Sequence, residues 1–521
     1  MRRGPRGRLY LLAAVLPALV SAQGLSSQAT DGRCARLKSL SRPGFTIVSA
    51  TRMPAGKFAA GGNDGFEIPA SCRVAAVARP GGDSRIAMEI WLPDGWIGRY
   101  AQLGNGGFAG NIDEASLANE IRRGNAAAMT DTGHKAGQFD ASWALRHPQR
   151  IVDYGYRSIK VTSDAAKAVI RQYYDRPIRR RYYIGCSNGG RQALMAAQRY
   201  PNDWDGIIAG SAAVQWTKQL ATFAAIQHRL RSSPESWIAP IKLPLIRRAA
   251  VAACSRQTAI GSCRLDVRRL TCANSNAPNC LTPAEAASLD LIQSGPKDAN
   301  GRPLFAGFDP VSATLPGNWE TWILNPDRNA PSQLAFATQA YRNMILDRPG
   351  WRVEAFSIGR DFELASRRQV AGQSLAAILD PDNPDLGPFA RRGGKLIMYV
   401  GGLDAAIAPV AAVDYYHRVA ERSGGMGPAQ RFARMFVIPG MQHCQGGLGP
   451  NAFGQAWVAP GLARDSTHDV RAALEGWVER GQAPDSITAV KYADDDPRGR
   501  LTATQKLWPF PKAPAPAAPT R

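Results

Sequence analysis

Short apolar and β-branched runs recur along the chain, separated by polar and amphipathic stretches. The runs predict strands at residues 86–92, 100–103, 126–130, 181–184, 393–400 and 435–438. The stretches 153–174 and 190–200 are typical of helices, and Pro201 ends the second one. Strands that alternate with helices predict an α/β fold.

The middle of the chain has a different character. Residues 214–381 are loop-rich by pattern and show little strand–helix alternation, and four of the eight cysteines lie between positions 254 and 280. We therefore expect a lid domain at 214–381, inserted between two parts of a core at 23–213 and 382–508. Residues 509–521, rich in Pro and Ala, predict an extended or disordered tail.

The first 22 residues have the pattern of a signal peptide. A basic start is followed by the apolar run 9–20 and by Val20-Ser21-Ala22, which fits a cleavage site. The run is short for a membrane anchor, and no later stretch reaches eighteen consecutive apolar residues. We expect an exported protein without stable membrane insertion. The pattern leaves open periplasm or secretion, and the oligomeric state.

The formal charge of +22 falls to +18 without the four arginines of that leader. Such a charge attracts anionic surfaces or ligands. The basic residues are scattered, however, and the cluster 179–181 leads directly into a predicted strand, so we expect a solvated basic surface and no nucleic-acid partner. Eight cysteines in an exported chain favour disulfides over metal ligation.

Residues 185–189, Gly-Cys-Ser-Asn-Gly, have the G-x-S-x-G spacing of a nucleophile elbow. This spacing also occurs by chance, but a predicted strand precedes it here and a predicted helix follows it. In such a turn the hydroxyl of Ser187 is exposed as a nucleophile.

Asp404 and His443 complete a candidate triad with Ser187, because the order Ser, Asp, His is that of α/β-hydrolases and each residue follows a predicted strand. Asp404 read alone is a turn aspartate. His417 and His468 follow no predicted strand, and we interpret both as surface residues.

Cys186 directly precedes Ser187, and Cys444 directly follows His443. A disulfide between the two cysteines would bring their Cα atoms within about 7 Å and make the nucleophile and the base neighbours. The alternative is that His443 is a packed core histidine and that the cysteines pair elsewhere.

The glycine-rich loop 104–110 follows a predicted strand and lacks the lysine of a P-loop. In an α/β-hydrolase a loop at this place supplies one oxyanion-hole N–H, here from Gly106 or Gly107, and the residue after the nucleophile, Asn188, supplies the other.

These motifs together resemble the tannase and feruloyl esterase family, which also includes hydrolases of mono(hydroxyethyl) terephthalate. The resemblance covers nearly all of the mature chain and is carried by residues 103–110, 130–134, 185–191, 199–201, 205–207, 383–386, 392–399 and 439–444. The Cys-Ser and His-Cys dipeptides are highly specific in combination.

The resemblance implies an α/β-hydrolase core with Ser187 as nucleophile, His443 as base and Asp404 as the acid that orients it. It also implies the disulfides Cys186–Cys444, Cys34–Cys72, Cys254–Cys263 and Cys272–Cys280. Many family members bind calcium in a loop between two cysteines of the lid, but residues 254–263 contain no carboxylate here. Calcium prefers several carboxylate ligands, so we predict that this site is lost and that no cofactor or metal is bound.

The expected function is hydrolysis of esters of aromatic, phenolic acids such as gallate or ferulate. Trp319, Trp322, Phe356 and Phe362 in the lid are candidate substrate contacts, because a flat acyl group stacks well on aromatic rings; the alternative is that they form the core of the lid. Other readings are a hydrolase of mono(hydroxyethyl) terephthalate or of simple aryl esters, a peptidase, and an inactive binding protein on the same fold.

Overall fold

A computed structural model describes Met1 and residues 31–59, 65–254, 261–272, 277–455, 462–512 and 518–519. The proposed leader, residues 1–22, lies almost entirely outside the described residues. Across the part of the chain that is described, no helix combines the length and the apolar character needed to cross a membrane.

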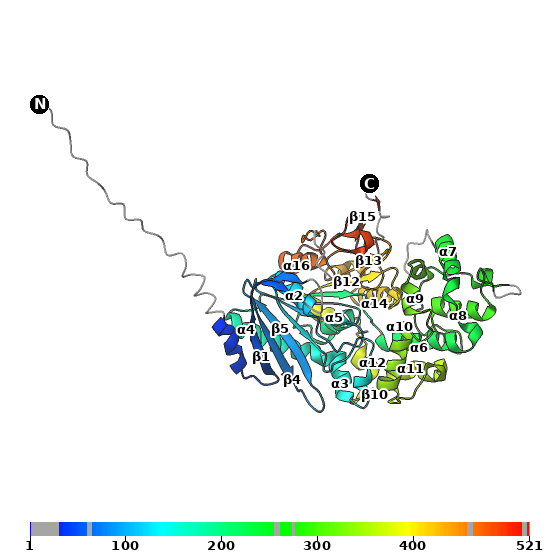
Figure 1. Ribbon diagram of the computed structural model, residues 1–521, viewed down its shortest axis with the longest axis horizontal. Coiled ribbons are helices and arrows are strands. Elements are labelled where there is room, and N and C mark those ends of the chain that lie inside the picture. Colours follow the sequence, from blue (N-terminus) through cyan, green and yellow to red (C-terminus); the bar gives the residue numbers. More distant parts are fainter. Residues whose placement is uncertain are drawn as a thin grey trace.

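A nine-stranded sheet forms the centre of the molecule (Figure 1). One end of the sheet is antiparallel and consists of β1 (Thr46–Met53), β4 (Ser71–Ala78) and β5 (Ile86–Pro93). The strand β5 also pairs antiparallel with the next strand of the sheet, β7. The rest is parallel, in the order β7 (Ala126–Thr130), β6 (Arg99–Leu103), β8 (Arg180–Cys186), β9 (Gly206–Gly210), β12 (Lys395–Gly401) and β13 (Ala433–Ile438). The α/β fold class expected from the alternation is present.

Helices cover both faces of this sheet, as a parallel sheet with two apolar faces requires. One face packs against α4 (Ser158–Tyr174), α5 (Asn188–Arg199) and α14 (Pro409–Arg422), and the other against α2 (Glu114–Arg122) and α16 (Val470–Arg480). The helix expected over 153–174 begins with a π-helical turn, η3 (Asp153–Arg157), after α3 (Pro148–Val152).

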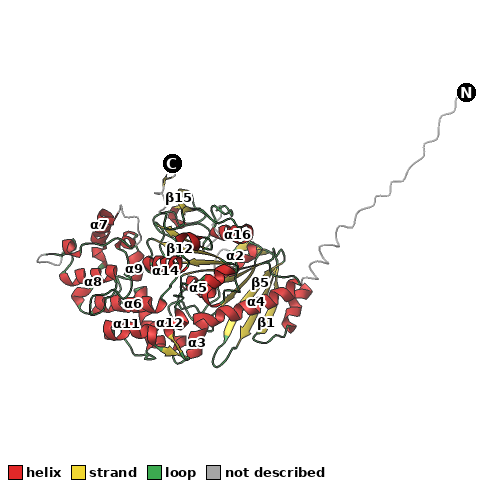
Figure 2. Cartoon of the chain, turned by 180° about the vertical axis from the view of Figure 1, so that it is seen from behind, coloured by secondary structure: helices red, strands yellow, loops and turns green. Residues whose placement is uncertain are grey.

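Residues 214–381, here called the lid, are mostly helical rather than loop-rich. They lie together beyond the β12 side of the sheet (Figures 1 and 2). Their helices share one apolar core, and short 3₁₀ turns and π turns with long connections account for the weak periodicity that suggested loops. The helices are α6 (Trp216–Arg231), α7 (Leu243–Cys254), α8 (Pro283–Ser294), α9 (Asn318–Trp322), α10 (Ser332–Ala340), α11 (Ile358–Arg367) and α12 (Leu375–Leu379).

The remaining elements are small. They are the strand pairs β2 (Gly56–Phe58) with β3 (Phe66–Ile68) and β10 (Gln369–Val370) with β11 (Gln373–Ser374), the sheet of β14 (Ile487–Tyr492), β15 (Leu501–Leu507) and β16 (Ala518–Pro519), and the helices α13 (Gly387–Arg391) and α15 (Met426–Gln430).

The C-terminal tail begins later than expected. The backbone N–H of Phe510 donates to Met435 O at 2.7 Å, and its ring contacts Tyr416 and His417. An aromatic side chain seated on the core therefore orders the start of the Pro/Ala-rich stretch. Residues 513–517 and 520–521 lie outside the described residues.

Candidate active site

Ser187 occupies the sharp turn between β8 and α5, with φ 62° and ψ −126°. This is a strained conformation for a residue with a side chain, and such strain concentrates at functional sites. The neighbouring glycines make the turn possible: a Cβ on Gly104, in the loop after β6, would lie 2.5 Å from the Cα of Gly189. The elbow and the glycine-rich loop are thus in direct backbone contact.

The side chains of Asp404 and His443 form a pair. The loop after β12 delivers Asp404, which is fully buried, and its Oδ2 lies 2.8 Å from Nδ1 of His443, in the loop after β13. The other carboxylate oxygen accepts the backbone N–H groups of Ala406 and Ile407 at 2.8 and 2.9 Å. These bonds fix the carboxylate, so the imidazole is held with one nitrogen toward Asp404 and the other free.

A disulfide brings the two halves of the site together. Cys186 and Cys444 are bonded, with their Cα atoms 6.0 Å apart. Ser187 and His443 line one cavity, as the neighbouring dipeptides require. Both residues are among those that the structure describes, and the hydroxyl of Ser187 makes no hydrogen bond to the imidazole of His443. Hydrogen bonds between catalytic residues often tighten only when substrate binds.

The described structure also pairs Cys34 with Cys72, Cys254 with Cys263 and Cys272 with Cys280, and leaves no described cysteine free.

Hydrogen bonds to three consecutive carbonyls hold the loop after β6. Gly106 O accepts from Ala109 N at 2.9 Å, Gly107 O from the hydroxyl of Tyr154 at 3.2 Å, and Phe108 O from His134 Nε2 at 2.8 Å. Within the described part of the chain the N–H of Gly107 donates no hydrogen bond. Gly107 lines the cavity beside Ser187, whereas Gly106 is exposed and lies outside the lining.

Gly107 cannot be replaced without disturbing this loop, because its φ is +53° and a Cβ would lie 2.2 Å from Gln138 O. Asn188 is the first residue of α5, so its N–H has no partner inside the helix. Two backbone donors, at Gly107 and Asn188, therefore flank the serine.

His134 was not singled out from the sequence. Its ring stacks on Trp143 with centroids 3.7 Å apart, and burial lowers its pKa to about 4. The ring is therefore neutral at pH 7 and carries one N–H, which serves the Phe108 carbonyl. The motif 130–134 thus acts through the glycine-rich loop.

The cavity at Ser187 is apolar and small, about 20 Å³. Apart from the serine, His443 and the two donor residues, its lining comes from Ala213, Trp216, Phe223, Trp322, Phe336, Ala406 and Ile407. None of these described lining residues is an arginine or lysine. Trp322 meets the His443 ring edge-on, with centroids 5.8 Å apart.

Of the four aromatic residues expected at the substrate, only Trp322 lines this cavity. Trp319, Phe356 and Phe362 are buried in the core of the lid instead. The indole N–H of Trp319 donates to Ser312 Oγ at 2.7 Å, and Phe356 packs edge-on against Tyr341. These three rings fill the apolar core between the helices of the lid and therefore do not reach the cavity.

Trp216, Phe223 and Phe336 take the expected places at the cavity, and sequence reasoning missed them. Trp216 and Phe223 are seven residues apart on α6, which places them on one face two turns apart, a spacing that could have identified them.

Arg191 is completely buried. Asp380, Asp382 and Asp385 lie where the chain passes from the lid into the second part of the core. Asp380 accepts from the N–H and hydroxyl of Thr217 at 2.9 and 2.6 Å, and burial raises its pKa to about 7. Asp382 and Asp385 pair with arginines of α14.

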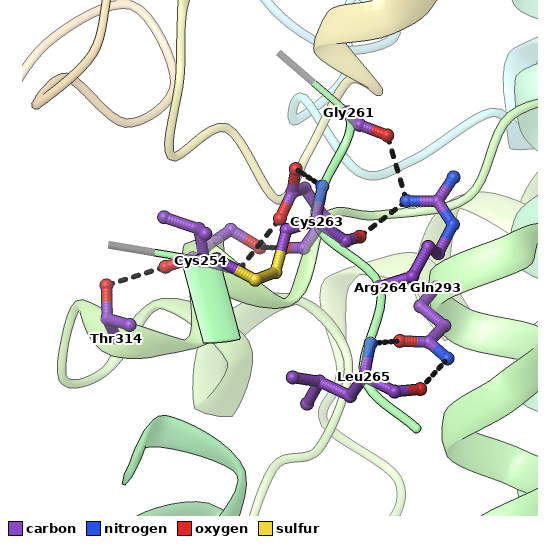
Figure 3. The surroundings of a disulfide bond; sticks show 10 residues. Cys254, Gly261, Cys263, Arg264, Leu265, Gln293 and Thr314 are labelled. Carbon is purple, nitrogen blue, oxygen red and sulfur yellow. Dashed lines mark hydrogen bonds between the residues drawn. A yellow bond between two sulfur atoms is a disulfide. The ribbon is translucent and has the colours of Figure 1, made fainter. Parts of the chain in front are cut away.

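The region that corresponds to the family's calcium loop begins at the end of α7 in the lid. Cys254 and Cys263 close it, and the guanidinium of Arg264 donates to the carbonyls of Gly261 and Cys263 at 3.0 and 2.7 Å (Figure 3). Residues 255–260 lie outside the described residues and include no carboxylate. Because a guanidinium faces these two carbonyls, we propose that no calcium is bound here.

His417 is exposed and His468 partly exposed; His468 pairs with Asp465 at 3.0 Å. Neither lines the cavity at Ser187.

Comparison with known proteins adds the context. The family described as "Tannase and feruloyl esterase" matches residues 72–518. An uncharacterized esterase of Xanthomonas campestris pv. campestris is 39% identical over 94% of this chain and 89% of its own length. A mono(2-hydroxyethyl) terephthalate hydrolase of Piscinibacter sakaiensis is 28% identical over 85% and 82%. The crystal structure of feruloyl esterase B from Aspergillus oryzae superposes with a TM-score of 0.82 at 24% identity, over 93% of this chain and 96% of that one.

Proposed function

Because this chain belongs to the tannase and feruloyl esterase family and is a carboxylic ester hydrolase, we propose that it is an exported serine esterase acting on esters of aromatic, phenolic acids such as gallate or ferulate. The observation that carries the proposal is the aromatic cavity directly beside Ser187. A flat acyl group packed between Trp216, Trp322 and Phe336 would place its carbonyl at the serine.

In the proposed mechanism His443 takes the proton of Ser187 as the hydroxyl attacks the ester carbonyl. The N–H groups of Gly107 and Asn188 stabilise the oxyanion. His443 then gives the proton to the leaving alcohol, and the acyl group stays on Ser187 until water, activated by the same imidazole, releases the acid. Asp404 holds the tautomer that leaves the free imidazole nitrogen able to accept.

The resting cavity is too small for an aromatic ring, since about 20 Å³ holds little more than one water molecule. Substrate entry therefore requires that residues lining the cavity move.

Hydrolysis of mono(hydroxyethyl) terephthalate, the activity named for one relative, is less well supported. That substrate carries a free carboxylate, and the described lining residues include no cation to pair with it. We infer an uncharged acyl group, and the panel below includes the terephthalate ester as a comparison.

Export is proposed from the leader-like residues 1–22 and from the disulfides, which persist in oxidising compartments. Fractionation of the native host into cytoplasm, periplasm and medium, with the N-terminal residue of the mature protein determined, tests it. A full-length protein in the cytoplasm would contradict export.

The purified protein should be incubated with methyl gallate, methyl ferulate, mono(hydroxyethyl) terephthalate and p-nitrophenyl acetate, and the released acid quantified by chromatography. We expect turnover of a phenolic ester that disappears in Ser187→Ala and His443→Ala and persists in His417→Ala, the exposed control. Turnover of p-nitrophenyl acetate alone would support a serine esterase but contradict the proposed specificity for esters of phenolic acids. Cleavage of an anilide without its matched ester would indicate a peptidase, and no serine-dependent turnover an inactive binding protein.

A further inference from the structure

The guanidinium of Arg191 lies in the first turn of α5, one turn after Ser187, and is fully buried. Its Nε donates to Asn188 Oδ1 at 2.7 Å and its Nη2 to Tyr154 O at 2.9 Å. Its Nη1 donates to Gly155 O and to Leu379 O, both at 3.0 Å. All four hydrogen bonds reach neutral oxygens.

A buried cation without a hydrogen-bonded carboxylate is costly to folding. The nearby carboxyl of Asp380 is directed to Thr217 rather than to the guanidinium, and its raised pKa indicates a partly neutral group at pH 7. The free-energy cost of burying this guanidinium therefore points to a role of Arg191 other than stabilising the fold.

The hydrogen bonds of Arg191 converge on the two oxyanion donors. On one side Nε fixes the side chain of Asn188, whose backbone N–H is one donor. On the other side the guanidinium holds the carbonyl of Tyr154 and lies over its ring, with Cζ 4.7 Å from the centroid. The hydroxyl of Tyr154 in turn holds the carbonyl of Gly107, the residue of the other donor.

The same guanidinium reaches the lid. Leu379, which accepts from Nη1, ends α12 and precedes Asp380, and Asp380 holds the start of α6 through Thr217. Trp216, next to Thr217, lines the cavity. One residue thus connects both oxyanion donors with the aromatic wall.

We propose that Arg191 is a positioning residue that sets the spacing of the Gly107 and Asn188 N–H groups and couples this spacing to the base of the lid. The inference rests on the proposed serine esterase function. The fork geometry is required, because three nitrogens donate in three directions, and lysine offers one nitrogen for the same task. The positive charge also has the sign that favours a nearby oxyanion.

The test measures the reaction of Ser187 with a p-nitrophenyl alkylphosphonate, which needs the oxyanion hole and no particular acyl group. The serine oxygen bonds to phosphorus, the bond from phosphorus to p-nitrophenolate breaks, and the serine proton passes to His443. Absorbance of p-nitrophenolate gives the rate, and intact mass with Ser187→Ala confirms the site.

We expect Arg191→Met to slow this reaction about 100-fold and Arg191→Lys about tenfold, with kcat on an ester lowered similarly and KM changed less. The control is Arg181→Met, since Arg181 in β8 pairs with Asp205 away from the cavity. That variant should react at the wild-type rate.

Tyr154→Phe provides a milder variant that removes the hydroxyl and with it the hydrogen bond to the carbonyl of Gly107. It should slow phosphonylation severalfold, and its effect should be non-additive with Arg191→Lys, because both act on one donor. Rates that fall only in proportion to the folded fraction, measured by circular dichroism, or effects that simply add, would overturn the proposal. If the phosphonate labels Ser187 of the wild type but no ester is hydrolysed, the proposed function is refuted. The labelling rates of the variants then still test the role of Arg191.

Discussion

Cys186 and Cys444 lie 258 positions apart in the chain and are joined by a disulfide that borders both Ser187 and His443. The link connects the loop after β8 with the loop after β13, across β9 and β12. It therefore constrains the distance between the proposed nucleophile and its base directly, rather than through the packing of the strands between them.

Removing this disulfide should impair catalysis as well as stability. For Cys186→Ala/Cys444→Ala we expect a loss of up to about 5 kcal/mol in the free energy of unfolding, from the entropy of the long loop in the unfolded chain. At temperatures where the variant is folded, kcat should still fall at least about tenfold, because the serine and imidazole lose their fixed separation.

The control is Cys254→Ala/Cys263→Ala, which opens a loop of nine positions in the lid. It should lose about 3 kcal/mol or less and keep its kcat. Chemical denaturation and steady-state kinetics measure both quantities. A folded Cys186→Ala/Cys444→Ala enzyme with unchanged kcat would show that the strands alone position the site.

Asp404→Asn should leave the fold intact and remove most activity. The amide can still accept from Ala406 and Ile407, but it presents an N–H₂ to His443 and favours the wrong tautomer. We expect kcat to fall about 10³- to 10⁴-fold with little change in Tm. Asp465→Asn, which alters the exposed pair with His468, should change neither value. A loss of less than tenfold for Asp404→Asn would remove Asp404 from the triad.

Trp319 and Trp322 are three positions apart on α9 and should respond in opposite ways. Trp322→Leu should lower kcat/KM for an aromatic ester about tenfold and leave stability nearly unchanged, because the ring lines the cavity. Trp319→Leu should cost about 3 kcal/mol of unfolding free energy and spare kcat/KM, because its ring fills the lid core. Equal kinetic effects of the two changes would contradict this assignment.

Asp380 should make stability depend on pH. Burial, together with Asp382, raises its pKa to about 7 while Arg191 opposes the shift, so between about pH 4 and 7 the folded protein holds a proton that the unfolded chain has released. Stability from this group is greatest at low pH and decreases as the pH rises through that range. Asp380→Asn keeps a neutral side chain against Thr217.

The measurement is the urea unfolding free energy of both proteins between pH 4.5 and 8. The difference, variant minus wild type, should increase with pH, because only the wild type is destabilised by ionisation. A constant difference would mean that Asp380 titrates normally or that Arg191 compensates its charge.

The sequence singled out three residues that lie together in the structure, but it failed for the aromatic contacts, for a physical reason. Ser187, Asp404 and His443 each follow a strand, and parallel strands bring their carboxyl ends to one edge of the sheet, so local patterns determine the meeting place. Trp319 and Trp322 have the same local pattern. Only the packing of α9 against its neighbours decides which ring faces the cavity.

The burial of Arg191 could have been predicted from its context. Its helix, Asn188–Arg199, is rich in Ala and Gly and is buried almost all round, so a residue one turn into it had little chance of reaching water. The spacing to Asn188 also places the two side chains on adjacent positions of one helix face. Burial predicted from the neighbours would have assigned this arginine to the site.

Calcium should have no effect on this protein. Arg264 donates to the carbonyls of Gly261 and Cys263, and a cation bound there would have to displace the guanidinium. We expect the same Tm in excess EDTA and in millimolar calcium, and no stoichiometric calcium in the dialysed protein by elemental analysis. Arg264→Asp, with a carboxylate in place of the guanidinium, serves as the comparison, since it removes the repulsion. A calcium-dependent rise in Tm of the wild type would show that the site persists, with oxygen ligands supplied by the rest of the loop.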